Sequence, residues 1–95
     1  MSDEVAAQRG RLAAEILASD VYKDAYEAVR QEYMHAWMQS PAGDVEGRES
    51  LFMMIKILDK VRADMAAQIA TGKMAQATLD AKAKRAVGIN TRFPL

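Results

Sequence analysis

The residues from Asp44 to Gly72 constrain the fold of this chain more than any other stretch. Acidic residues stand at its beginning, apolar residues recur along it, and a Thr-Gly pair stands at its end, which is the pattern of one long α-helix. One helical face carries Leu51, Ile55, Leu58, Met65 and Ile69, and Met54, Ile57 and Val61 widen it. Because Lys56 is the one polar residue between 51 and 58, we expect this helix to be covered on more than one side.

A second helix is predicted over about residues 20–39. Its aromatic residues share one helical face with a valine, at spacings of three and four residues: Tyr22, Tyr26, Val29, Tyr33 and Trp37. This period is typical of a packed face rather than of a platform for stacking nucleic-acid bases. The segment Ser40-Pro41-Ala42-Gly43-Asp44 breaks the pattern, and its aspartate is a suitable N-cap. Such a short link predicts an antiparallel hairpin of the helices at about 20–39 and 44–71.

Weaker helices are predicted at both ends of the chain. The first covers about residues 4–18, and Gly10 in its middle is expected to loosen its first turns. Ser19 or Asp20 then caps the second helix. After the long helix an alanine-rich helix is predicted over about 73–87, followed by an extended tail from Gly88. We therefore expect an all-α fold, with residues 1–72 as a helical domain and residues 73–95 as a basic C-terminal helix and tail.

The net charge of zero hides an asymmetry along the chain. Residues 1–70 carry 8 Lys/Arg and 12 Asp/Glu, a balance of −4, whereas residues 71–95 carry 5 Lys/Arg and one Asp, a balance of +4. An acidic body with a basic end indicates head-to-tail association, or docking on an acidic partner. The alternative is that cations simply stand near the end of a C-terminal helix, where its dipole favours them. The candidate phosphate contacts are Lys82, Lys84 and Arg85.

The residues that carry chemistry are few. The chain has no cysteine and one histidine, His35, without a nucleophile or an orienting partner at a useful spacing. Arg48, Lys56 and Arg62 do not share one helical face, so they do not form the anion site of a helical chorismate mutase. The charged residues of the middle of the long helix are interpreted as its solvated face: Asp59, Lys60, Arg62 and Asp64. We predict no enzyme, no cofactor and no bound metal.

No apolar run approaches the ~20 residues that a membrane-spanning helix needs. The opening Met-Ser-Asp-Glu is acidic, which is unlike a secretory signal, and the lack of cysteine fits a reducing compartment. We expect no membrane association, and a location in the cytoplasm or in an assembly built there.

The apolar surface exceeds what one hairpin covers, which predicts completion by oligomerisation or by a larger assembly. The candidate partner interface on the long helix is Leu51, Met54, Ile55 and Leu58. The C-terminal tail is either a disordered terminus or a short docking peptide. In the second case Phe93 and Leu95 are its anchors and Arg92 is its charged contact.

Three short runs together resemble a group of phage proteins: Tyr33-x3-Trp37, Asp44-x-Glu46-Gly47-Arg48-Glu49-x-Leu51 and Leu58-x2-Val61-Arg62. They are similar, over about residues 10–66, to short uncharacterised α-helical proteins encoded in the head and packaging gene clusters of tailed bacteriophages. The resemblance implies a virion-associated or packaging-associated role, in the virion or the host cytoplasm. It brings no catalytic residues with it.

Three hypotheses of function follow. The leading one is a bacteriophage structural or assembly protein that forms a homo-oligomer or docks on other virion proteins. The second is a DNA-recognition subunit similar to a small terminase subunit, which predicts salt-dependent DNA binding through Lys82, Lys84 and Arg85. The third is a phage inhibitor of a host defence enzyme.

Overall fold

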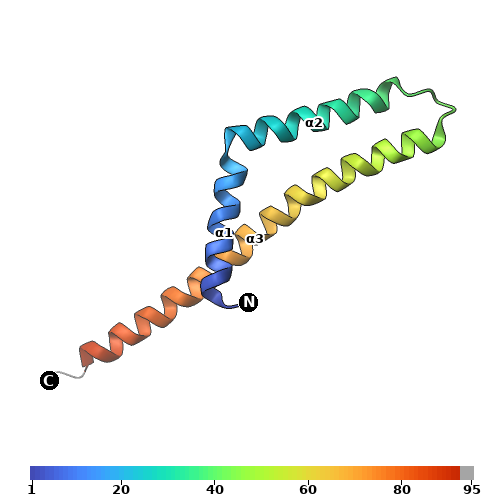
Figure 1. The fold of residues 1–95 in the computed structure, drawn as a ribbon. Helices are drawn as coiled ribbons and strands as arrows, with labels where there is room; N and C mark the ends of the chain where they lie inside the picture. Colours follow the sequence, from blue (N-terminus) through green and yellow to red (C-terminus); the bar gives the residue numbers. More distant parts are fainter. Residues whose placement is uncertain (93–95) are drawn as a thin grey trace.

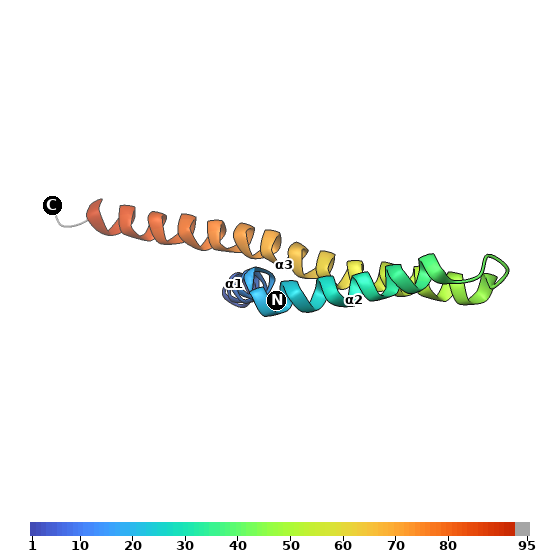
Figure 2. The ribbon, with the colours of Figure 1, turned by 90° about the horizontal axis from the view of Figure 1, so that it is seen from above.

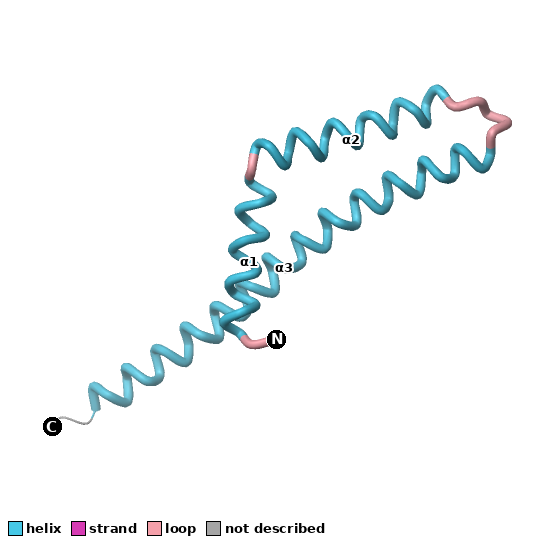
Figure 3. Tube along the Cα trace, in the orientation of Figure 1, coloured by secondary structure: helices cyan, strands magenta, loops and turns pink. Residues whose placement is uncertain are grey.

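The computed structural model describes the backbone of residues 1–92 and the side chains of residues 1–87. It contains α1 (Asp3–Ala18), α2 (Asp20–Gln39) and α3 (Val45–Arg92), and no strand occurs within residues 1–92 (Figure 1, Figure 3). The predicted all-α class is confirmed. So is the hairpin, in which α2 and the first half of α3 run antiparallel on either side of the loop at 40–44 (Figure 1).

Each helix begins at a side chain that accepts a hydrogen bond from a free backbone N–H. Ser2 Oγ accepts from the N–H of Val5 at 3.2 Å, and Ser19 Oγ accepts from the N–H of Tyr22 at 3.3 Å. Asp44 Oδ1 accepts from the N–H of Gly47 at 3.1 Å, as its predicted capping role requires. Ser19 alone separates α1 from α2, and its extended backbone makes the sharp bend between them (Figure 1).

The third helix differs most from the sequence prediction. The expected stop at Thr71-Gly72, the separate helix over 73–87 and the extended tail from Gly88 are wrong, because α3 continues unbroken to Arg92. A glycine ends a helix when it adopts the left-handed conformation, and no described glycine has a positive φ. The alanines that follow favour helix, so nothing stops α3 there. The two predicted domains consequently share one helix.

Gly72 lies where α1 crosses α3, opposite Gly10. A Cβ atom built on Gly10 would lie 2.8 Å from the Cα of Gly72 and 2.9 Å from the carbonyl oxygen of Gln68. Both glycines are buried, together with the alanines around them: Ala6, Ala7, Ala13 and Ala75. The expectation that Gly10 loosens α1 is therefore wrong, since the missing side chain lets the two backbones touch.

Polar contacts flank this crossing on both sides. Arg9 Nε donates to Gln68 Oε1 at 3.4 Å, and Arg11 Nη1 donates to Gln76 Oε1 at 3.1 Å. Lys82 Nζ lies 3.8 Å from Asp3 Oδ2 and extends the contact toward the C-terminal end of α3. Because these pairs are exposed, each contributes little stability.

The molecule is long and thin. Its extents are 81 × 24 × 14 Å and its radius of gyration is 21.7 Å, against about 12 Å for a compact domain of this length. The thinnest dimension has room for at most two packed helices, whose axes lie about 8–10 Å apart, and Figure 2 shows α1 lying on one side of α3. As a result, no large side chain in the described part of the chain is completely buried.

Candidate interaction surface

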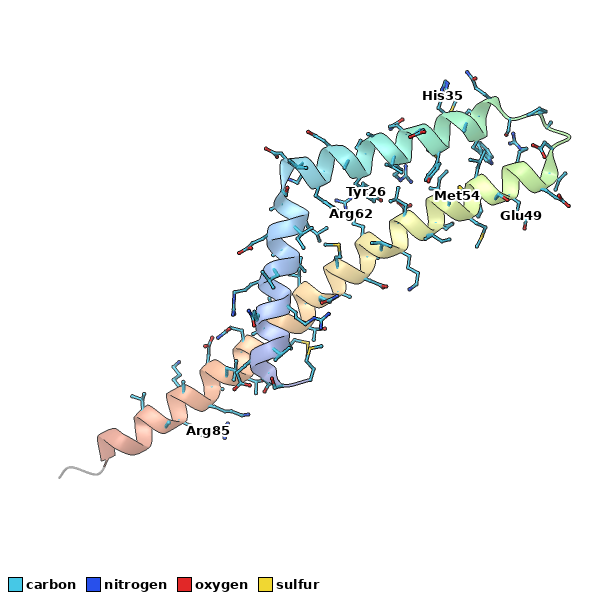
Figure 4. The ribbon with its side chains drawn as sticks, in the orientation of Figure 1. Tyr26, His35, Glu49, Met54, Arg62 and Arg85 are labelled. Carbon is cyan, nitrogen blue, oxygen red and sulfur yellow. The ribbon has the colours of Figure 1, made fainter. Side chains whose placement is uncertain are left out.

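A polar cluster around Asp59 joins the two arms of the hairpin. Arg30 Nε donates a hydrogen bond to Asp59 Oδ1 at 3.0 Å, and Arg30 Nη2 donates one to Oδ2 at 3.3 Å. The Tyr26 hydroxyl also donates to Asp59 Oδ1, and the Arg62 guanidinium lies 5.0 Å from the centre of the Tyr26 ring (Figure 4). The interpretation of Asp59 as part of a solvated face is therefore wrong, since its carboxylate is turned toward α2.

This cluster gives the hairpin a predicted pH dependence. The hydrogen bonds from Arg30 and Tyr26 lower the pKa of Asp59 from its ordinary value of 3.8. Because folding lowers this pKa, the Asp59 carboxylate adds stability that is fully present above pH 3.8. This stability is lost as the pH falls through the folded-state pKa of Asp59. We expect Asp59→Asn to be less stable than the parent at pH 7, and the difference to shrink as the pH falls below 3.8, as followed by thermal unfolding at a series of pH values. A difference that stays constant with pH would contradict this role.

Ionisation of the Tyr26 hydroxyl would remove its hydrogen bond to Asp59 at high pH. Its hydrogen bond to the Asp59 carboxylate raises the pKa of Tyr26 above the ordinary value of 10.0. Because folding raises this pKa, the Tyr26 hydrogen bond contributes stability below pH 10.0. That contribution is lost as the pH rises through the folded-state pKa of Tyr26. The cluster therefore supports the hairpin through the whole neutral range.

Arg48 joins the hairpin at its closed end. Its Nη1 donates to the carbonyl oxygens of Trp37 and Ser40 at 3.2 and 3.1 Å, and to Ser40 Oγ at 2.8 Å. The guanidinium also lies 4.4 Å from the centre of the Trp37 ring. The last turn of α2 has no basic residue of its own, so Arg48 supplies donors to carbonyl groups that a helix end leaves free. Arg48 is thus a structural residue of the loop.

The main candidate site is an apolar stripe on the outer side of α3, formed by Met54, Ile57 and Val61. These residues are exposed by 44%, 59% and 52%, and Met53 beside them is exposed as well. Residues 18 positions apart are about five turns apart, so they lie on the same side of an α-helix. Each stripe residue lies 18 positions before a residue of α3 that contacts α1. The pairs are Met54 with Gly72, Ile57 with Ala75, and Val61 with Leu79. The side of α3 that α1 covers therefore continues upstream without cover.

The structure separates the residues predicted as a partner interface. Ile55 is 8% exposed and lies inside the hairpin, and Leu51 and Leu58 are half-buried on that same side. Met54 alone among the four is exposed toward solvent. Ile57 and Val61 belong to the outer stripe, although the sequence pattern indicated them only as a widening of the packed face.

A second exposed apolar row lies on α1. Val5, Leu12 and Ile16 recur at spacings of seven and four residues and are exposed, whereas the small residues of α1 face α3. The row and the α3 contact occupy different sides of α1, so this helix is apolar on two sides. This helix therefore exposes an apolar row in addition to the side that packs on α3.

The predicted phosphate contacts lie beyond the α1 crossing. Lys82 is engaged with Asp3, while Lys84 and Arg85 are exposed and make no ion pair within residues 1–87 (Figure 4). The side chain of Arg92 is not described, and Phe93 and Leu95 lie outside the described residues. The suggested docking peptide stays a prediction.

The remaining residue considered as a candidate for chemistry is the single histidine. His35 is exposed on α2, as expected of a surface histidine (Figure 4). Within the described residues, no three His, Cys, Asp or Glu side chains gather as metal ligands would. None of the helices in that part of the chain combines the length and apolar character needed to cross a membrane. No protein-family model matches the chain, and no curated protein or solved structure is significantly similar to it.

Proposed function

We propose that this chain is a structural subunit of a helical assembly, completed by association with other subunits. One observation carries the proposal: its accessible surface is 7390 Å², whereas a folded monomer of 10.5 kDa exposes about 5,400 Å². The difference of about 2,000 Å² per chain is the size of surface that obligate partners cover.

The kind of surface left open supports an association role. The stripe of Met54, Ile57 and Val61 extends the side of α3 that already binds a helix, so another helix can pack there in the same way. Met53 beside it adds a second flexible thioether, which adapts well to a partner surface. Together with the resemblance to phage head and packaging proteins, these features support a virion-associated assembly protein.

The test is the mass of the protein in solution. We expect the parent to form a defined oligomer by light scattering at micromolar concentration, and Met54→Glu/Ile57→Glu to be a monomer with unchanged helical content. Two charges placed in an apolar contact cost several kcal/mol and would abolish a moderate-affinity contact. A parent that is a monomer at every concentration would refute the proposal.

Met38→Glu is the control for an added charge outside the stripe. Met38 is also an exposed methionine, but it lies on α2, away from the outer side of α3. We expect this variant to keep the mass of the parent. Loss of assembly in both variants would indicate that added charge, rather than the stripe, is responsible.

The DNA-recognition hypothesis has a narrower basis. It rests on Lys84 and Arg85, two exposed cations on a helix whose third candidate, Lys82, is engaged with Asp3. Two contacts give weak binding with a shallow dependence on salt. Lack of affinity for duplex DNA at low salt would remove this alternative and leave the assembly role untouched.

A further inference from the structure

A shallow hollow lies at the start of α3, next to the stripe. It is lined by Glu46, Glu49, Ser50, Met53 and Met54, so two carboxylates border a surface of two thioethers. Neither carboxylate forms an ion pair within the described residues. Acidic groups around exposed methionines suit a basic helix with a small apolar face.

The other end of α3 has this complementary character. After the α1 crossing, α3 continues without a neighbouring helix (Figure 1). Its exposed residues include the alanines Ala77, Ala81 and Ala83, with Lys84 and Arg85 beside them. A single helical segment of this length is marginally stable in water, so a packing partner would be expected to stabilise it.

We propose that the hollow of one protomer holds residues 77–87 of a second copy, and that the two contacts occur reciprocally in a closed antiparallel pair. The proposal rests on the assembly role and specifies the partner. The hollow and residues 77–87 lie toward opposite ends of one helix of 48 residues. A two-fold axis near the middle of α3 therefore brings each segment to the hollow of the other copy, and the same patches serve both protomers.

The charges favour this orientation over a parallel one. Residues 44–50, which include the two carboxylates of the hollow, carry three Asp/Glu and one Lys/Arg, while residues 73–87 carry four Lys/Arg and one Asp. An antiparallel pair sets unlike charges against each other twice, whereas a parallel pair sets like charges against each other twice.

Charge reversal in two separate variants tests the arrangement. Lys84→Glu/Arg85→Glu places an acidic segment against the acidic hollow, and Glu46→Lys/Glu49→Lys places a basic segment against a basic hollow. We expect each variant alone to raise the dissociation constant of the dimer about tenfold or more, measured by analytical ultracentrifugation. Mixed in equal amounts, they should form a heterodimer as stable as the parent dimer, because both contacts regain unlike charges.

The quadruple variant with all four reversals has the net charge of the parent and should dimerise as the parent does. Asp24→Lys/Glu32→Lys, which changes the net charge as Glu46→Lys/Glu49→Lys does on exposed positions of α2, should leave dimerisation unchanged. Circular dichroism of each variant checks that the lysines near the start of α3 have not unwound it.

The outcomes separate this inference from the assembly role. If the parent associates but both double variants associate equally well, the antiparallel contact is refuted and the assembly role stands. Polymers that grow with concentration would refute the closed pair, since an open head-to-tail contact does not stop at two copies. A monomeric parent would refute both proposals.

Discussion

Gly72→Ala is expected to lower the thermal stability of the protein, although alanine is the better helix former by about 1 kcal/mol. The new methyl group would lie 2.8 Å from the Cα of Gly10 and 3.0 Å from the carbonyl oxygen of Ala6. Both are backbone atoms, so the clash is relieved only if α1 moves away from α3. We expect a net loss of about 2 kcal/mol, or about 10 °C in the unfolding midpoint by circular dichroism.

Gly43→Ala is the control for this substitution. A Cβ atom at Gly43 meets nothing within 4 Å, and its φ is not positive, so alanine fits without strain. This variant should match the parent or gain up to about 1 kcal/mol through the lower entropy of its unfolded chain. Amide hydrogen exchange locates the effect of Gly72→Ala, which should raise exchange in α1 first. A stabilised Gly72→Ala protein would show that α1 does not lie against α3.

Ile55→Ala is expected to weaken the folding of the chain, whereas Ile57→Ala is expected to weaken its association. Ile55 is 8% exposed inside the hairpin, and its truncation should lower the folding stability by about 2 kcal/mol. This value is at the lower end of the range for such substitutions, because none of the large side chains around it is completely buried. Ile57 is 59% exposed, so its truncation should change the stability of the isolated chain by less than about 0.5 kcal/mol. Chemical denaturation of both variants measures the difference.

Measurement at two protein concentrations separates folding from association. The loss in Ile55→Ala should be largely independent of concentration, whereas Ile57→Ala should lose apparent stability where the parent is associated. Equal losses in the two variants at the lowest concentration would mean that the outer stripe is covered within the chain.

Local sequence patterns predicted the elements that depend on near neighbours. The three- and four-residue spacing from Tyr22 to Trp37 indicated the side of α2 that faces α3, and Asp44 was a recognisable N-cap. The position of Gly72 could not be interpreted in this way, because glycine suits both a helix end and a close crossing. Deciding between them requires knowledge of a helix about 60 residues away. The spacing of Ala6 and Gly10, two small residues one turn apart, was a usable indication of the crossing.

The candidate surface was harder to predict for a related reason. From residue 51 to 58 almost every position is apolar, so the sequence alone does not indicate which side α2 covers. The contact of Asp59 with Arg30 and Tyr26 fixes that rotation, and it turns Ile55 inward and Ile57 outward. Asp59, the first acidic residue after Glu49, was the available clue. Its interpretation as a solvated residue was wrong.

The distance along the chain between α1 and its binding site has a consequence for synthesis. The polar contacts between α2 and the first half of α3 join residues that lie between Tyr26 and Arg62, so all of these partners are synthesised before Gln68. The polar partners of α1 on α3, from Gln68 to Lys82, are added 59 to 79 positions after the α1 residues that they contact. At about 5–20 residues per second, a ribosome leaves α1 without its partner for several seconds. Of these three helices, α1 is therefore synthesised first and docks last. Its docking requires that translation has passed the part of α3 that α1 crosses.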